Sequence, residues 1–163
     1  MNTNQQVLKS VPVVVEEIYK ASLEKVWNAI TDENLMREWF FPEMKSFKPV
    51  VGFETQFYVM ANRVNYLHRW KVLEVVPFKK LSFEWKYPDY SGDSHVLFEI
   101  SGNDKATQLK FSHFGIETFP QNNPDFSRES CTGGWNYFIG KSLKEFLEKK
   151  DDDNADYDPD FEI

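Results

Sequence analysis

Residues 18–40, which read IYKASLEKVWNAITDENLMREWF, form the most specific local pattern in the chain. Residues 11–20, which overlap its start, are rich in Val, Ile and Tyr, and this composition predicts a first β-strand. Ser22 and Asp32 are typical helix N-caps, and apolar residues follow each of them at helical spacing. We therefore expect two short helices after the strand. The second should end before Pro42, because the residue preceding a proline avoids the α region.

The chain that follows has an extended character, with turn residues between short segments. Alternation is clearest in one segment where polar residues occupy one face and the other face carries Leu81, Phe83, Trp85 and Tyr87. One covered face is typical of an antiparallel sheet. In the long third segment the alternation changes phase after Val72, which predicts a bulge that bends the strand. The expected strands are 44–50, 53–60, 64–76, 80–87, 94–101 and 107–114.

The strongest helix pattern covers residues 124–149. Asn123 is suited to the N-cap, Pro124 to the first helical position, and apolar residues recur at helical spacing in the second half. Gly133 and Gly134 interrupt the pattern at a cost of about 1 kcal/mol each relative to Ala. The pair indicates close approach to the sheet, a kink, or space left open for something else. Such a helix must bury its apolar stripe, and the covered face of the sheet is the available partner.

A chain of 163 residues fits one domain. Cys131 is the only cysteine, which excludes an internal disulfide and favours a reducing compartment. The apolar stretch near the N-terminus is too short for a signal peptide or a membrane span, so we expect a cytoplasmic protein without a membrane span. We divide the chain into an N-terminal extension (1–10), a folded domain (11–149) and an acidic disordered tail (150–163).

The net charge of −7 arises in that tail, where residues 151–163 hold six Asp, one Glu and no base. Removing these seven from the 26 acidic residues leaves 19, which equals the number of Lys and Arg. A neutral body with an acidic tail lacks the concentrated basic face that nucleic acid requires, so we expect no nucleic-acid partner. The tail is interpreted as a solvated segment or as a docking segment that ends in Phe161 and Ile163.

Three motifs carry a resemblance to a known family: IYKASLEKVWNAITDENLMREWF (18–40), EVVPFKKLSFEWKYP (74–88) and GGWNYFIGKSLKEFLE (133–148). Together with the element order they resemble the START-like (SRPBCC, helix-grip) superfamily. Within it the likeness is to the branch named after the activator of the 90-kDa heat-shock chaperone's ATPase, in its stand-alone bacterial form. The resemblance spans residues 11–149. It implies an α+β helix-grip fold, in which a curved antiparallel sheet of about seven strands (β-α-α-β6-α) wraps around a long C-terminal helix.

The resemblance also implies a kind of site. Similar members enclose an apolar cavity between the sheet and the long helix, bind lipids, sterols, hormones or polyketide-like molecules there, and in a few cases catalyse cyclisations. The eukaryotic co-chaperone of this branch has a separate N-terminal domain that does most of the chaperone binding. Only about ten residues precede the first expected strand here, so we expect that domain to be absent. We therefore do not expect this chain alone to activate a chaperone ATPase.

The three histidines, His68, His95 and His113, are the first candidates for chemistry. Alternation places His68 and His113 inward and His95 outward, and no H-x-x-x-H or C-x-x-C spacing is present. We therefore expect neither a metal nor a cofactor. The two inward histidines are interpreted either as buried, hydrogen-bonded residues or as polar anchors for a ligand head group. No sequence pattern pairs Cys131 with a base, which predicts an inert thiol.

The aromatic residues supply the main functional signal, since such rings can fill a core or border a cavity. We expect no catalytic residue, and the hypothesis is non-enzymatic binding of a small apolar, aromatic or lipid-like molecule between sheet and helix. One alternative is a chaperone- or stress-related interaction module. The other is a cyclase- or hydratase-like enzyme with His68 or His113 as general base. The expected ligand-binding residues are Trp39, Phe57, Tyr66, His68, Trp70, Phe83, Trp85, His113, Trp135 and Phe138.

Overall fold

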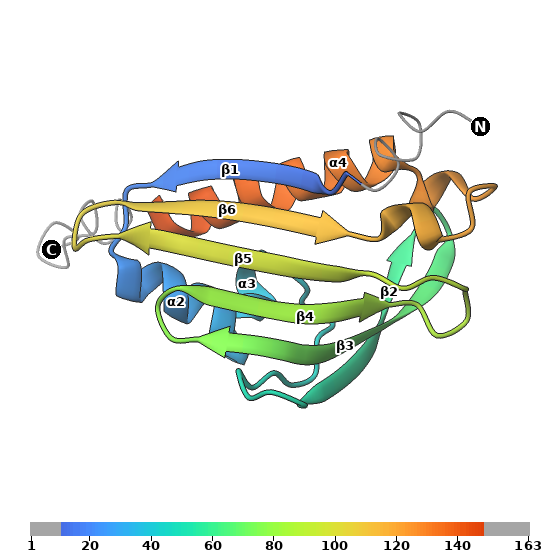
Figure 1. Ribbon diagram of the computed structural model, residues 1–163, viewed down its shortest axis with the longest axis horizontal. Coiled ribbons are helices and arrows are strands. Elements are labelled where there is room, and N and C mark those ends of the chain that lie inside the picture. The colour runs from blue at the N-terminus through green and yellow to red at the C-terminus, as the bar shows by residue number, and fades with distance from the viewer. Residues whose placement is uncertain (1–10, 149–163) are drawn as a thin grey trace, which may run out of the picture.

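The structure is a computed structural model that describes residues 11–148, and within them six antiparallel strands form one curved sheet backed by helices (Figure 1). The sheet order is β1-β6-β5-β4-β3-β2. The expected extension at 1–10 and the expected tail at 150–163 lie outside the described residues. The elements are β1 (Val13–Tyr19), α2 (Leu23–Thr31), α3 (Glu33–Trp39), β2 (Glu54–Ala61), β3 (Val64–Val76), β4 (Lys80–Lys86), β5 (His95–Gly102), β6 (Thr107–Phe114), η1 (Ile116–Thr118), η2 (Pro124–Phe126), α4 (Arg128–Tyr137) and η3 (Phe138–Ser142).

The two short helices form as the sequence predicts, because each has its own cap. The side chain of Ser22 accepts a hydrogen bond from the backbone N–H of Lys25 at 3.1 Å, and α2 begins there. Asp32 accepts from the N–H groups of Asn34 and Leu35, at 2.8 and 3.2 Å, and starts α3. Polar caps of this kind satisfy donors that the first helical turn leaves free. The α+β helix-grip fold, with strand, two helices, strands and a final helix in that order, is confirmed.

The strand count is one lower than the expected seven, since residues 44–50 form an irregular segment. Met44 and Phe47 are both buried, three residues apart, whereas a strand would send them to opposite faces. Pro49 also removes a backbone donor that a ladder would need. The segment therefore fills the core with side chains while its backbone stays outside the sheet.

The bulge predicted in the third segment is confirmed, since the β3–β4 register shifts between Val72 and Glu74. Before the bulge, Tyr66, His68 and Trp70 are all buried on the covered face of β3. A bulge increases the local bend and twist of a strand. The bend lets β3 and its partner β2 curl toward the helix side, as Figure 1 shows at the right of the molecule.

The last helix begins later than the sequence predicts. Asn123 caps only the short turn η2, through a hydrogen bond from the N–H of Asp125. Ser127 then returns to an extended conformation and caps α4 by accepting from the N–H of Ser130 at 3.1 Å. Arg128 donates to the carbonyl oxygens of Val11 and Pro12, and so ties the start of α4 to the segment leading into β1.

A π-helical turn, η3, interrupts the last helix before it continues through residues 143–148. Such a turn inserts one extra residue and rotates the side chains that follow. Tyr19 at the end of β1 donates its hydroxyl to the carbonyl oxygen of Ile139 within this turn, at 2.7 Å. Ile139 and Leu143 are completely buried against the sheet. The turn thus separates a part of the helix that packs on the core from an earlier part, α4, that borders a hollow.

Candidate functional site

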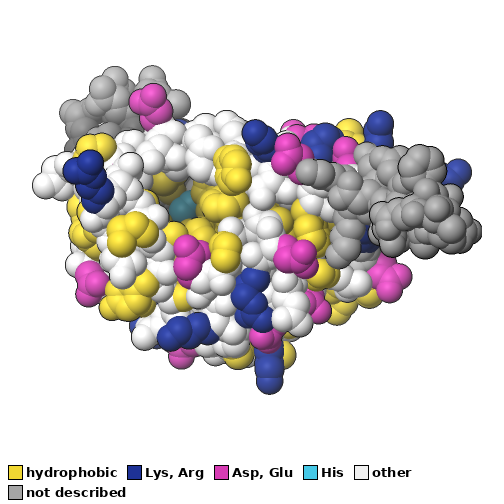
Figure 2. All heavy atoms as spheres, turned by 180° about the vertical axis from the view of Figure 1, so that it is seen from behind, with side chains coloured by type: hydrophobic (Ala, Val, Ile, Leu, Met, Phe, Trp, Pro, Cys, Tyr) yellow, Lys and Arg dark blue, Asp and Glu magenta, His cyan; other side chains and the backbone are white. Residues whose placement is uncertain are grey.

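A pocket of about 300 Å³ lies at one end of the covered sheet face, between the β2–β3 hairpin and the start of α4. Figure 2 shows the hollow on the helix side of the molecule, with histidine atoms at its base and hydrophobic side chains around it. Its wall is mainly aromatic and is contributed by both sheet and helix. The lining residues are Phe41, Val59, Ala61, Asn62, Tyr66, His68, Trp85, Tyr87, His113, Asp125, Phe126, Ser130, Cys131, Gly134, Trp135 and Phe138.

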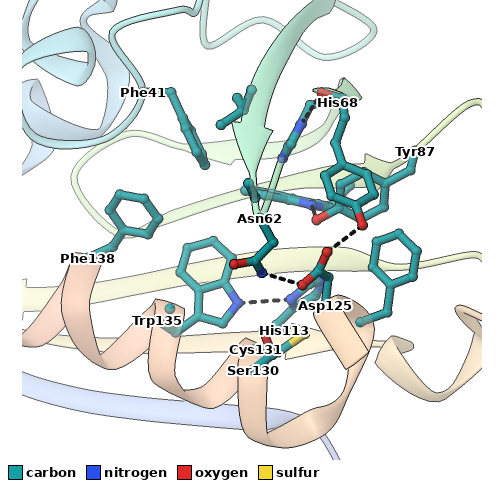
Figure 3. Close-up of a pocket in the computed structure, with 16 residues that line it drawn as sticks. Phe41, Asn62, His68, Tyr87, His113, Asp125, Ser130, Cys131, Trp135 and Phe138 are labelled. Carbon is teal, nitrogen blue, oxygen red and sulfur yellow. Dashed lines mark hydrogen bonds between the residues drawn. The ribbon is translucent and has the colours of Figure 1, made fainter. Parts of the chain in front are cut away.

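His113 is held on both ring nitrogens, and Figure 3 shows the bond from Trp135. The indole N–H of Trp135 donates to Nδ1 at 2.9 Å, so this nitrogen carries no proton. Ser94 spends its only hydroxyl hydrogen on the carbonyl oxygen of Trp85, so its oxygen must accept from Nε2–H of His113, at 3.0 Å. Burial lowers the pKa of His113 to about 3, which agrees with a neutral ring. His113 is therefore a structural link between β6, the β4–β5 connection and α4.

His68 presents one free acceptor. Its Nδ1 lies 3.1 Å from the carbonyl oxygen of Tyr66, and because a carbonyl only accepts, Nδ1 must carry the proton. The remaining nitrogen, Nε2, has a lone pair and no hydrogen-bond partner among the described residues. His68 is only 6% exposed, and this burial lowers its pKa to about 4. The ring is therefore neutral at pH 7. His68 thus offers a buried, uncharged acceptor at the pocket wall.

Tyr87 presents a free donor on the same wall. Its hydroxyl oxygen accepts from the indole N–H of Trp85 at 2.9 Å, and its own hydrogen has no acceptor among the described residues. Burial raises the pKa of Tyr87 far above its ordinary value, so the phenol keeps its proton. The rings of Tyr87 and His68 meet edge to face with centroids 4.8 Å apart.

A set of polar contacts closes one side of the pocket mouth (Figure 3). The carboxylate of Asp125, on η2, accepts from the side chain of Asn62 at the hairpin tip and from the hydroxyl of Tyr66, each at 2.5 Å. Asn123 donates a further bond to the Tyr66 hydroxyl at 3.1 Å. Asn62 and Arg63 both have positive φ angles, 50° and 69°, which shape the tight hairpin turn that reaches Asp125. We call Asn62, Tyr66, Asn123 and Asp125 the mouth latch.

The pocket has one charged lining residue among those that the structure describes, Asp125, and no Lys or Arg. Burial raises the pKa of Cys131 to about 11, so this thiol is protonated at neutral pH and is a poor nucleophile. Apart from the mouth latch and the Ser130 hydroxyl, the lining is therefore mainly apolar, with the His68 acceptor and the Tyr87 donor as neutral polar groups on its wall. A site of this kind suits a neutral organic molecule.

The glycine pair on α4 opens the helix side of the pocket. A Cβ atom added at Gly133 or Gly134 would meet nothing within 4 Å. Gly134 lines the pocket, whereas its neighbour Gly133 does not. Of the readings that the sequence allowed, the contacts therefore exclude close approach to the sheet and agree with space left open.

The structure brings six of the ten expected ligand-binding residues to the pocket and places four deeper. Trp39 donates its indole N–H to the carbonyl oxygen of Ala29 and so joins α3 to α2. Phe57, Trp70 and Phe83 pack in the core behind Phe41. The Trp70 ring lies near 5 Å, between centroids, from the rings of Phe57, Phe83 and Trp85. Trp70, Trp85 and Trp135 form a continuous row of indoles, with centroids 5.2 and 5.1 Å apart. The six pocket residues are Tyr66, His68, Trp85, His113, Trp135 and Phe138, and the four deeper ones are Trp39, Phe57, Trp70 and Phe83.

Several pocket-lining positions were not among the expected ligand-binding residues. Phe41 follows α3 directly and closes the inner end of the pocket against His68 and Phe138, with centroids 5.4 and 5.0 Å away. Alternation placed Tyr87 on the same inward face as Trp85, but Tyr87 was not among the expected ligand-binding residues, and it lines the pocket. The latch residues lie in two turns far apart in the chain, so no local pattern could join them.

Two further observations concern the described part of the chain. No cluster of three His, Cys, Asp or Glu side chains within residues 11–148 is arranged to hold a metal ion. Across the same residues, none of the helices is long and apolar enough to cross a bilayer.

The comparisons with known proteins agree with this architecture. The model of the family described as "Activator of Hsp90 ATPase homolog 1-like protein" matches residues 20–148. No functionally curated protein matches the chain.

Solved structures from several bacteria share the fold. Protein MLL2253 from Mesorhizobium loti is 30% identical, with a TM-score of 0.64 over 85% of this chain and 97% of its own. Protein CV1439 from Chromobacterium violaceum is 20% identical, with a TM-score of 0.70 over 85% and 98%. A protein from Colwellia psychrerythraea, solved in solution as the Aha1 dimer, is 20% identical, with a TM-score of 0.64 over 85% and 96%.

Proposed function

The chain belongs to the family of activator of Hsp90 ATPase homolog 1-like proteins, and we propose that this member binds a small apolar or aromatic molecule without changing it chemically. The observation that carries the proposal is the aromatic-walled pocket of about 300 Å³ between sheet and helix. Ligand pockets commonly measure about 300–1,000 Å³ and are mostly apolar with a few convergent polar groups. The cytoplasmic location expected from the single cysteine is part of the same proposal.

The volume of the pocket limits the size of the ligand. An engineered apolar cavity of about 150 Å³ holds one benzene molecule. A pocket of about 300 Å³ therefore has room for a ligand of about two fused rings, and a long lipid chain would extend beyond it. We infer a compact ligand in preference to the lipid-like class.

The neighbouring glycines provide a matched test. Gly134→Leu places a side chain into the pocket, and Gly133→Leu places the same side chain on the same helix outside the pocket lining. With 2-naphthol as the probe, calorimetry should detect binding to the unmodified protein and to Gly133→Leu, and at least a tenfold loss for Gly134→Leu. Equal affinity for both variants would place the ligand elsewhere. If neither 2-naphthol nor the parent hydrocarbon naphthalene binds the unmodified protein, the proposal fails.

An enzymatic function has weaker support. A general base works best when its pKa lies near the operating pH. The pKa of His68 is lowered to about 4, and both nitrogens of His113 are engaged in hydrogen bonds. We therefore do not extend the proposal to a cyclase- or hydratase-like reaction.

Binding of a chaperone or a stress-related partner is the second candidate, and one surface observation favours it. Tyr58 and Met60 are 52% and 62% exposed on β2, a strand at the edge of the sheet. Exposed apolar residues on a sheet edge are common at protein interfaces. Pure 90-kDa heat-shock chaperone should then bind the unmodified protein, and a Tyr58→Thr/Met60→Thr variant should bind at least tenfold more weakly. Absence of binding by the unmodified protein would exclude this candidate.

A further inference from the structure

We propose that the pocket selects uncharged ligands carrying a hydroxyl group, which donates to Nε2 of His68 and accepts from the hydroxyl of Tyr87, and that it rejects carboxylates of the same shape. This inference rests on the proposed ligand-binding function and names the chemical class of the ligand. It concerns two atoms whose hydrogen-bonding capacity the described residues leave unused.

The acceptor half of the inference comes from His68. The carbonyl oxygen of Tyr66 fixes the proton on Nδ1 and leaves the lone pair of Nε2 unpartnered among the described residues. The ring is 94% buried and lines the pocket, where Phe41 and Phe57 pack against it at centroid distances of 5.4 and 5.5 Å. Among the described residues, the buried side-chain atom without a hydrogen bond is Nε1 of Trp70, so Nε2 of His68 is open to the pocket. A ligand donor that replaces water at Nε2 therefore gains a hydrogen bond inside a mostly apolar pocket.

The donor half comes from Tyr87. Trp85 already fills the acceptor role of the Tyr87 oxygen, which leaves the O–H hydrogen to point at a group outside the described hydrogen bonds. The His68 and Tyr87 rings are in edge-to-face contact at 4.8 Å and both line the pocket, from which we infer that their two polar groups share one area of the wall. The area therefore offers one donor and one acceptor and carries no charge.

A hydroxyl group matches this pair, since it donates one hydrogen and accepts through its lone pairs. A carboxylate only accepts, so it can take the hydrogen of Tyr87 but offers none to Nε2 of His68, whose lone pair would face its oxygens. Among the described residues, no Lys or Arg lines the pocket to neutralise such a charge, and Asp125 at the mouth adds a negative one. Burial of an unpaired charge is strongly unfavourable.

The test compares three probes of one ring system on the unmodified full-length protein by isothermal titration calorimetry at pH 7. These are naphthalene, 2-naphthol and 2-naphthoate. A phenol is neutral at this pH and a carboxylic acid is ionised. We expect 2-naphthol to bind about tenfold more tightly than naphthalene, in line with one or two net hydrogen bonds. We expect 2-naphthoate to bind at least about tenfold more weakly than naphthalene.

Two substitutions locate the effect. His68→Phe and Tyr87→Phe each keep an aromatic ring and remove one polar group, so each should reduce the advantage of 2-naphthol over naphthalene about threefold or more. Naphthalene serves as the control for pocket shape in each variant. If a variant does not fold, the three-probe comparison on the unmodified protein still decides.

The outcomes distinguish a failure of the hydroxyl preference from a failure of ligand binding itself. If naphthalene binds but 2-naphthol shows no advantage, or 2-naphthoate binds as well, the hydroxyl preference is wrong and ligand binding stands. If none of the three probes binds, the proposed function fails and the inference fails with it.

Discussion

Lowering the pH from 7 to 4.5 should destabilise this protein through His68 and His113. Both rings are buried, and burial lowers their pKa values to about 4 and about 3, below the ordinary value near 6.5. In the unfolded chain the same groups take up protons as the pH falls through about 6.5. The folded state keeps both rings neutral, so their contribution to the free energy of unfolding is fully present above this pH. It is lost as the pH falls toward 4.

The size of the effect follows from the proton difference. Below pH 6 the unfolded chain binds nearly two more protons than the folded protein at these positions, which gives a slope of about 3 kcal/mol per pH unit. Between pH 6.5 and 4.5 the loss amounts to roughly 5 kcal/mol. That figure is comparable with the whole free energy of unfolding of a typical domain, about 5–15 kcal/mol.

The assay is urea unfolding at a series of pH values, with His68→Phe and His113→Phe as comparison variants. Each variant should lose about half of the histidine contribution to the slope, even where its stability at pH 7 is lower because Trp135 or Tyr66 loses a partner. The imidazole C–H resonances of His68 and His113 should also remain unshifted between pH 8 and 5. Resonances that titrate near pH 6.5, or slopes that the substitutions leave unchanged, would refute the neutral, hydrogen-bonded arrangement.

Three further outcomes are expected. Asp125→Ala removes the hub of the mouth latch, so amide hydrogen exchange at the β2–β3 hairpin tip should accelerate about tenfold, while Asp89→Ala in another exposed loop should leave it unchanged. Gly133→Ala and Gly134→Ala should each raise the free energy of unfolding by about 1 kcal/mol in thermal denaturation, because the added methyl groups meet open space on a helix. Gly115→Ala should lower it by more than 1 kcal/mol, since φ is +86° there and the new Cβ would lie 2.2 Å from a backbone oxygen. A stabilised Gly115 variant, or glycine-to-alanine changes on the helix that destabilise, would contradict the described geometry.

The features that the sequence predicted correctly are those with a local physical cause. Ser22 and Asp32 cap donors two or three residues away, so the two short helices could be read directly. The phase change after Val72 likewise records the bulge within one strand. Two predictions, the start of the last helix and the strand at 44–50, were wrong because the sequence there carries competing local signals. Asn123 is an adequate cap, but Ser127 starts α4, and the apolar segment 44–50 buries its residues at a spacing that a strand cannot use.

The pocket was less predictable because its chemistry depends on contacts between distant segments. Alternation placed His68 and His113 on the same inward face, and both are buried. They differ because Ser94 and Trp135 occupy both nitrogens of His113, whereas Nε2 of His68 has no hydrogen-bond partner in the described part of the chain. Strand periodicity also could not tell a ring at the pocket from one a layer deeper, as with Trp85 and its neighbour Trp70.

The row of three indoles has an optical consequence. Trp135 and Trp85 border the pocket, and Trp70 lies behind them at 5.2 Å from Trp85. Indoles this close share excitation energy, so light absorbed by one of them is distributed along the row. A molecule that touches only Trp135 should therefore alter the fluorescence of the whole row, including a ring that it never contacts. The protein thus contains its own reporter, and occupancy of the pocket can be followed without a dye or a label.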